Sequence, residues 1–401
     1  MLQITLGIVT SVGGFLEIGS VTTAAQAGAR FGYQLLWAIA LGTICLIFLV
    51  EMSGRLAAVS KHTVVDAMRE RFGFPFFFIV CVGIVVVAFM VLVAELGGIG
   101  FGLQILTGIG FPWWAVPISF VVWLLMWKGT FGLIENGASL LGLVTLSFLF
   151  AAFRLHPSWS SAGAALIPSM PQSGKAQYGF IAVSIIGASI SPYLMYFYSS
   201  GAIEDKWDRT YIPINRFIAG FGMTFGGVLS IAVLIASALA LQPNGILVDT
   251  FPQAALLMTT ALPKWGFYLF AVSMIFACFG AALEISLAIA YFFAQGFGWN
   301  WSEDLEPSKN ARYAFVYTII IMLAAIPLVL GVDPIKVTVI SMALTSATLP
   351  LAIVPFLFLM NDPIYLGKYR NGWISNTVVA IIILMSFVLA VISIPLQIIG
   401  G

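Results

Sequence analysis

Long apolar runs recur from one end of the chain to the other, separated by short polar connections. A run of about eighteen apolar residues is long enough to cross a bilayer as a helix. The predicted spans are residues 3–27, 32–56, 75–107, 112–128, 136–154, 177–202, 212–241, 264–297, 311–330, 335–359 and 373–398. The longest connection, residues 156–177, is predicted to be an ordered surface loop. We therefore expect a single all-α, polytopic membrane domain of about eleven helices.

Two of these spans contain polar and helix-breaking residues near their middle. The first reads EIGSVTT from Glu17, and the sixth reads GASISPY up to Tyr193. If spans 1–5 and 6–10 are two halves, the breaks fall at corresponding places, as in secondary transporters whose site lies at the membrane midplane. The alternative is two unrelated kinks, because Gly and Pro are common in membrane helices. Glu17 favours a site, since a charge at bilayer depth costs ~2.5 kcal/mol or more.

Composition supports a membrane protein and excludes several other classes. Hydrophobic residues make up 61% of the chain, charged residues 8%, and the net charge is +1. This near-neutral balance argues against a nucleic-acid partner, and no obligate protein partner is indicated. The three cysteines are isolated in apolar runs, so we expect buried, unpaired thiols. The N-terminus lacks a basic region and a cleavage site, so we expect no removable signal peptide.

Lysine and arginine positions predict the orientation. With the N-terminus inside, the inner loops and helix ends hold twelve of the 17 basic residues, and an odd number of spans places the C-terminus outside. We expect an integral protein of a prokaryotic cytoplasmic membrane, surrounded by the lipid bilayer.

At the two breaks the sequence resembles the NRAMP family of divalent-metal transporters. The stretch EIGSVTTAAQAGARFGYQLLW resembles the family's first helix, and ISPYLMYFYSS resembles its sixth. The stretches PSWSSAGAALIPSMP, LVAELGG, TLPLAIVPFLFLMND and IYLGKYRN extend the resemblance over essentially the whole chain. The resemblance implies a LeuT-type fold with alternating access. Its inverted repeats would span about 1–154 and 177–359, with helices 1 and 6 broken and an extra helix at about 373–398.

The same resemblance implies a metal site with several departures from the family pattern. Glu17 stands where the family has its metal-binding Asp, and Ser20 stands where it has Asn. Ala188 matches the alanine whose carbonyl joins the metal shell. Ser191 replaces the metal-binding methionine, and Tyr193 replaces the histidine linked to proton transfer.

The implied proton route is also incomplete. Glu95 is kept, but Leu92 replaces an aspartate one helical turn earlier, and both histidines, His62 and His156, fall in loops. We therefore expect weak or no proton coupling. In span 10, Met342 replaces a glutamine that can reach the ion in the family.

Oxygen ligands suit hard ions such as Mg²⁺ or Mn²⁺, whereas thioethers favour softer transition metals. The expected ligands, Glu17, Ser20, Ala188 and Ser191, offer only oxygens. The sequence thus predicts a hard divalent ion that keeps part of its water, since Mg²⁺ sheds water reluctantly. Met195, one turn beyond Ser191, is a further possible sulfur ligand.

Glu284 is an unexpected carboxylate in the otherwise apolar span 8. It could line the ion or proton path with Glu95 and Tyr193, or be held structurally by Ser286, another hydroxyl or a carbonyl. Glu51, four residues before Arg55, is predicted to form an ion pair. Glu135 is interpreted as structural.

The leading hypothesis is a secondary transporter whose cargo, and not a cofactor, is a divalent ion. The alternatives are a transporter of a small organic solute on the same scaffold, and an ion-binding sensor or channel-like protein. No nucleophile–base pair or phosphate-binding loop indicates an enzyme.

Overall fold

The computed structural model describes residues 17–129, 143–262 and 265–400, and in this part of the chain the regular structure is entirely helical. The α-helices are α2 Ile18–Phe31, α3 Leu36–Ser60, α4 Val64–Phe72, α5 Phe74–Thr107, α6 Phe111–Lys128, α8 Leu146–Arg154, α9 Trp159–Ala164, α10 Lys175–Ser189, α11 Pro192–Glu204, α12 Ile212–Ala240, α13 Phe251–Ala261, α14 Trp265–Gly296, α15 Ala311–Val329, α16 Pro334–Asn361, α17 Pro363–Leu366 and α18 Trp373–Gly400. Four 3₁₀ turns are η1 Leu143–Thr145, η2 Arg209–Tyr211, η3 Gln242–Asn244 and η4 Gly367–Tyr369.

Within the described residues, nine helical segments are long and apolar enough to cross a membrane. They correspond to nine of the predicted spans, and the α10–α11 pair forms one of them, Lys175–Glu204. The other two predicted spans, 3–27 and 136–154, lie partly outside the described residues, as does Glu135. Helices suit a membrane because their backbone N–H and C=O groups form hydrogen bonds within the helix. The hydrocarbon core of the bilayer offers those groups no other partners.

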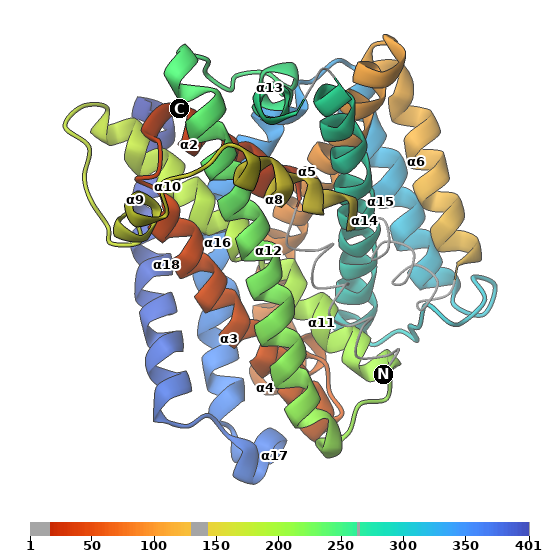
Figure 1. Cartoon of the computed structure of the whole chain (residues 1–401). Helices are drawn as coiled ribbons and strands as arrows, with labels where there is room; N and C mark the ends of the chain where they lie inside the picture. Colours follow the sequence, from red (N-terminus) through yellow and green to blue (C-terminus); the bar gives the residue numbers. More distant parts are fainter. Residues whose placement is uncertain (1–16, 130–142, 263–264, 401) are drawn as a thin grey trace.

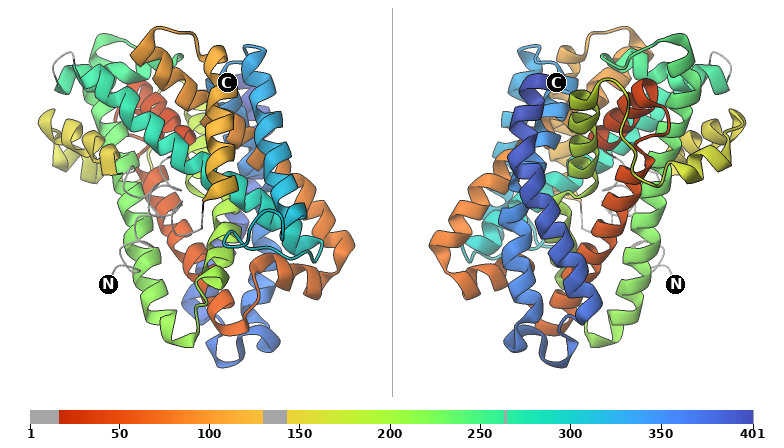
Figure 2. Two further views of the ribbon diagram at one scale, coloured as in Figure 1. Left: turned by 90° about the vertical axis from the view of Figure 1, so that its right-hand side faces the viewer. Right: turned by 90° about the vertical axis from the view of Figure 1, so that its left-hand side faces the viewer.

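The helices form one bundle with two ends, which Figure 1 shows as upper and lower. The lower end carries α4 and α17, and the upper end carries α13 and the start of α6. Helices α2 and α3 pack against α12, and α5 packs against α14 and α16. Figure 2 shows the blue helices α16 and α18 side by side, and α6 beside α15 elsewhere in the bundle.

The connection at residues 156–177 is ordered and largely exposed, as predicted, and it contains the short helix α9. Ser158 begins α9 and accepts a hydrogen bond from the Ser161 amide, which satisfies one of the free N–H groups of that helix end. His62 and His156 both lie outside helices. The prediction that neither imidazole lies inside a membrane helix is therefore confirmed.

A buried polar network ties the lower end together. Arg55 is 5% exposed, and its guanidinium donates to the Tyr369 carbonyl at 2.7 Å and to Asn371 Oδ1 at 2.8 Å. The same group lies 3.2 Å from Glu51, and Arg216 lies 3.5 Å from that carboxylate. The predicted Glu51–Arg55 pair is confirmed, and it links α3 to the segment that follows α17.

Candidate functional site

The break between α10 and α11 follows from Pro192. Proline has no N–H and disfavours helical backbone in the residue before it. Helix α10 ends at Ser189, Ser191 is extended at φ −77° and ψ 112°, and Pro192 begins α11. In a continuous helix the Ala188 carbonyl would accept from the amide of residue 192. Because that residue is proline, the carbonyl is left without its helical partner and accepts instead from the Ser191 hydroxyl at 3.3 Å.

Glu17 lies at the start of α2, where the described part of the first predicted span begins. Glu17 is the N-cap residue, with extended backbone at φ −99° and ψ 171°, and its side chain is fully buried. Ser20 lies in the first turn of the same helix and is 5% exposed. A carboxylate at a helix N-terminus is favoured by the helix dipole, so Glu17 suits this position as an anion.

The start of α2 and the α10–α11 break meet at the Glu17 carboxylate. The Tyr193 hydroxyl donates to Glu17 Oε2 at 2.8 Å, and the Ser191 hydroxyl lies 3.4 Å from Glu17 Oε1. Ser191, Ala188 and Tyr193 are all at most 5% exposed. The structure therefore brings together four of the residues singled out in the sequence, although Glu17 is far from the other three along the chain.

Glu95 lies beside this junction rather than apart from it. Its Oε1 accepts from the Ile18 amide at 3.0 Å, which caps the N-terminus of α2 from α5. The Cys278 thiol donates to the same carboxylate, and Glu95 and Glu17 are near enough to interact electrostatically. Within the described residues, Glu95 Oε2 has no hydrogen-bond partner, and no basic side chain forms an ion pair with Glu17 or Glu95.

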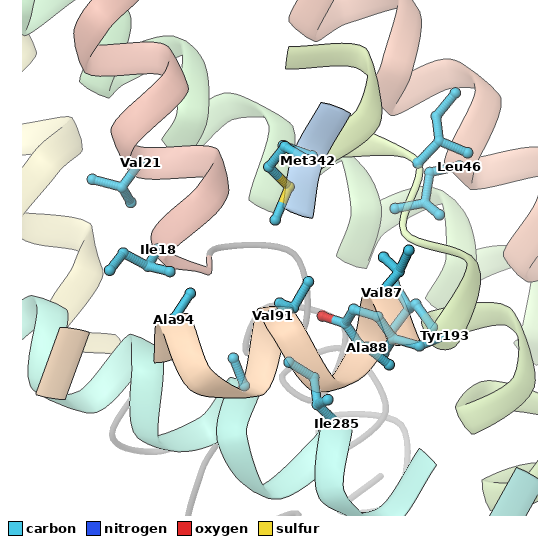
Figure 3. Packing of buried hydrophobic residues seen from close by; sticks show 14 of the residues in the cluster. Ile18, Val21, Leu46, Val87, Ala88, Val91, Ala94, Tyr193, Ile285 and Met342 are labelled. Atoms are coloured by element: carbon cyan, nitrogen blue, oxygen red, sulfur yellow. The ribbon is translucent and has the colours of Figure 1, made fainter. Parts of the chain in front are cut away.

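Met342 of α16 closes one side of the junction. Its side chain lies against Gly19 so closely that a Cβ on that residue would collide with it. Its carbonyl lies equally close to Gly187, so the two glycines let α2 and α10 approach α16. Figure 3 shows the Met342 sulfur pointing into the space bounded by Ile18, Val91 and Tyr193.

Glu284 lies in α14, is 3% exposed, and is within electrostatic range of Tyr193. The Ser286 hydroxyl donates to the Ala282 carbonyl at 2.7 Å, so its proton is not available to Glu284. One of the structural alternatives for Glu284 is thereby excluded. Met195 is buried in the hydrophobic core.

The junction can offer one carboxylate and several neutral oxygens to a cation. Among the described residues, no three His, Cys, Asp or Glu side chains group together as a metal cluster. A cavity of about 10 Å³ adjoins Ser191, Pro192, Tyr193 and Thr345, roughly the room that one water molecule needs. This cavity has no room for an ion that keeps its hydration shell.

Two contacts here could not be read from the sequence. Cys278 looked like an ordinary buried thiol, and its neighbour Glu95 lies on another helix. Met342 was noted as a departure in span 10, but its contact with Gly19 depends on how α16 crosses α2. No spacing pattern within one helix carries either signal.

Comparisons with known proteins identify relatives of the chain and of its fold. A family model described as "Natural resistance-associated macrophage protein-like" matches residues 7–395. The fold is similar to a manganese transporter of Eremococcus coleocola, solved with an aromatic bis-isothiourea substituted compound, at a TM-score of 0.84 and 20% identity over 99% of this chain and 87% of that one. The fold is also similar to that of a Na⁺-coupled sialic acid symporter, with a TM-score of 0.63 and 12% sequence identity over 96% of this chain and 89% of the symporter. Mhp1, a nucleobase-cation-symport-1 family transporter, has a similar fold, with a TM-score of 0.63 and 14% sequence identity over 98% of this chain and 91% of Mhp1.

Proposed function

The chain belongs to the Nramp family of divalent-metal transporters, and from this premise we propose that it carries a hard ion, Mg²⁺ or Mn²⁺, held between α2 and the α10–α11 break. The supporting observation is that Tyr193 and Ser191 direct their hydroxyls at the single carboxylate of Glu17. The ligands are the Glu17 carboxylate, the Ser20 and Ser191 hydroxyls and the Ala188 carbonyl. All are oxygens, which Mg²⁺ and Mn²⁺ prefer.

Charge explains why a cation would bind here. Glu17 and Glu95 are fully buried, and among the described residues neither has a basic ion-pair partner. A buried carboxylate is costly unless it is paired, protonated or bound to a metal. A divalent ion would compensate both charges at once. The Glu17 carboxylate and the neutral oxygens would replace part of the water bound to an arriving ion.

The ion would keep some of its water during transport. One carboxylate and about three neutral oxygens fill only part of a six-ligand shell, and Mg²⁺ usually retains several waters. The small cavity beside Ser191 cannot hold these waters. Binding of a hydrated ion would therefore require α10 and α11 to move relative to α5 and α16, as alternating access demands.

Proton coupling would be weak or absent. Tyr193 occupies the place that the family resemblance gives to a histidine, and it already donates its proton to Glu17. The two imidazoles lie in loops. The driving force would then be the membrane potential, worth ~2.3 kcal/mol per charge per 100 mV. Glu95 and Glu284 are the remaining groups that could carry a proton.

We also propose that the lower end faces the cytoplasm and that the two inverted repeats span about 1–154 and 177–359. Figure 1 shows α4 and α17 at the lower end. Arg71 lies in α4, Arg55 bonds the segment after α17, and Arg216 lies 3.5 Å from Glu51 beside Arg55, so these basic residues support this orientation. The N-terminus would then be inside and the C-terminus outside, in a prokaryotic cytoplasmic membrane.

Uptake into proteoliposomes tests this function. Vesicles with an imposed negative internal potential should accumulate Mn²⁺, and excess Mg²⁺ should compete, while an internal pH dye should show little acidification. Glu17→Gln should abolish uptake, and the exposed-site control Glu306→Gln should not. Efficient Cd²⁺ or Fe²⁺ uptake with no competition by Mg²⁺ would refute the hard-ion assignment. Acidification in proportion to metal entry would refute the uncoupled mechanism.

A further inference from the structure

A second cavity, of about 460 Å³, opens at the upper end of the bundle. Its walls come from α2, the start of α10, the start of α16 and the connection between α12 and α13. Most of the lining is apolar, including Phe180, Ile181 and Val339. Small-molecule sites typically measure ~300–1,000 Å³ and combine an apolar lining with a few placed polar groups, so this cavity has the size and character of such a site.

The charged groups in the lining favour an anion. Arg30 and Lys336 contribute two positive charges, and Asp249 contributes one negative charge. No ion pair joins any of these three to another described residue. The Asp249 amide donates to Gln253 Oε1 at 2.9 Å, so its backbone is anchored to the start of α13. The cavity thus presents one guanidinium and one ammonium group, neither held in an ion pair among the described residues, and its lining carries a net positive charge.

Local helix electrostatics do not account for Lys336. A positive charge is favoured in the last turn of a helix and disfavoured in the first. Arg30 lies in the last turn of α2, where it is favoured. Lys336 lies in the first turn of α16, and the nearby Asp333 carboxylate is used in capping that helix, accepting from the Ile335 amide at 3.0 Å. The first turn of α10, with Gln177, also faces the cavity, so two helix N-termini add to its positive potential.

The cavity lies in line with the ion site. Val339 lines it, and Met342, on the same face of α16, contacts Gly19 near Glu17. Gln26 and Arg30 continue the α2 face above Gly19, and the Gln26 amide donates to the Val248 carbonyl at 3.0 Å. A cation that approaches Glu17 from the upper end would pass a positively charged chamber, which lowers its local concentration.

We propose that this cavity binds a small organic carboxylate. The carboxylate would lie between Arg30 and Lys336, and an apolar body would pack on Phe180, Ile181 and Val339. Arginine suits the head group because its planar fork matches a carboxylate in two parallel hydrogen bonds. The bound anion neutralises the chamber and speeds entry of the metal ion from the upper end. Binding of the anion itself does not depend on Glu17.

Calorimetric titration of the full-length protein in phosphatidylcholine nanodiscs tests the site. The probes are benzoate, benzamidine, which has a similar ring but a positive head, and inorganic phosphate, which lacks the apolar body. Benzoate should bind at least tenfold more tightly than the other two. Arg30→Gln and Lys336→Gln should each weaken benzoate at least tenfold, whereas Arg154→Gln, an exposed residue outside the cavity, should not. Matched melting temperatures would show that the variants fold.

The proposal is overturned if the two cavity variants bind benzoate as well as the parent protein, or if benzamidine binds equally well. Glu17→Gln should keep the benzoate affinity, so this experiment can succeed even if the metal assignment fails. In vesicles at low ionic strength, saturating benzoate should lower the KM for Mn²⁺ severalfold, and Lys336→Gln should remove that effect. An unchanged KM in the parent protein would overturn the link to ion entry.

Discussion

Glu17 is fully buried and Glu51 is largely buried at 15% exposed, yet the surroundings of the two glutamates differ sharply. Glu51 lies at the lower end against Arg55 and Arg216, and Arg55 is itself anchored on two further acceptors. Glu17 lies at the start of α2, is fully buried, and accepts hydrogen bonds from the Tyr193 and Ser191 hydroxyls, with no basic ion-pair partner among the described residues. Glu51 thus has basic partners within the protein, whereas under the proposed function the charge of Glu17 is compensated by the transported ion.

Removing the charge at each of the two positions should distinguish the two glutamates most clearly. Glu17→Gln should weaken Mn²⁺ binding at least ~100-fold, about 2.7 kcal/mol, because the junction would lose its one carboxylate. Glu51→Gln should leave Mn²⁺ affinity within about twofold while lowering the melting temperature. Calorimetric titration and thermal melting measure the two effects. Equal losses of affinity would mean that the distinction between the two glutamates is wrong.

Removing the partner of Glu51 should give a comparable loss, but in stability. Arg55→Met leaves the Glu51 carboxylate and the Tyr369 carbonyl without the guanidinium. Arg55 is 5% exposed and donates to three acceptors, and each buried polar group left without its partner costs ~1–3 kcal/mol. We expect a clear drop in the denaturation midpoint, with an unchanged Mn²⁺ affinity in the folded fraction. A matched change, Arg312→Met in the α15 first turn, should have little effect on stability, since the described Arg312 contact is a cation–π contact with Trp299.

A third glutamate, Glu303, is also buried without a described basic partner, and it should make the stability of the protein depend on pH. Glu303, in the loop between α14 and α15, is 5% exposed. Burial raises its pKa to about 8, the Tyr313 hydrogen bond lowers it, and the neighbouring Glu204 and Asp304 raise it further. Between about pH 4.5 and pH 8 the folded state keeps a proton on Glu303 that the unfolded state has released. The contribution of Glu303 to the free energy of unfolding is therefore full below about pH 4.5 and is lost as pH rises through about 8.

Between these two pH values Glu303 should lower stability by up to about 1.4 kcal/mol per pH unit. Glu303→Gln should flatten that part of the melting-temperature profile, and Glu306→Gln, an exposed neighbour, should not. An unchanged slope in Glu303→Gln would contradict the assignment.

The sequence predicted the break in the sixth span because it has a local chemical cause. Pro192 interrupts the helix between α10 and α11, whereas the polar run after Glu17 is helical in α2, and the rest of the first span lies outside the described residues. The residue-level contacts of the site were harder to predict. That Tyr193 bonds Glu17, that Glu95 caps Ile18, and that Cys278 adjoins Glu95 all depend on how separate helices pack. One sequence contains no record of those crossings except through the family resemblance.

Tyr193 gives a smaller, graded test of the Glu17 environment. Tyr193→Phe removes the 2.8 Å hydrogen bond to Glu17 Oε2 without changing the ring. A hydrogen bond to a charged group is worth ~1.5–3 kcal/mol, and part of it would be regained by bound water. We expect Mn²⁺ affinity to fall about tenfold. Tyr196→Phe is the matched control, because Tyr196 is equally buried but makes no described contact with Glu17; a similar loss there would show that the effect is not local.

Met342 provides the test with the smallest expected effect. It concerns the selectivity of the proposed site between ions, rather than whether an ion binds beside Glu17. Its thioether is the soft atom that the structure places at Gly19, beside the oxygens of the junction. If the shell is made of oxygen, Met342→Gln should leave Mn²⁺ affinity within about twofold and weaken competition by Cd²⁺ about threefold, since sulfur favours the softer ion. Met195→Leu is the matched control in α11 and should change neither value. A tenfold loss of Mn²⁺ binding in Met342→Gln would instead make the thioether a ligand, and the contrast with Glu51 would then rest on a mixed oxygen–sulfur site.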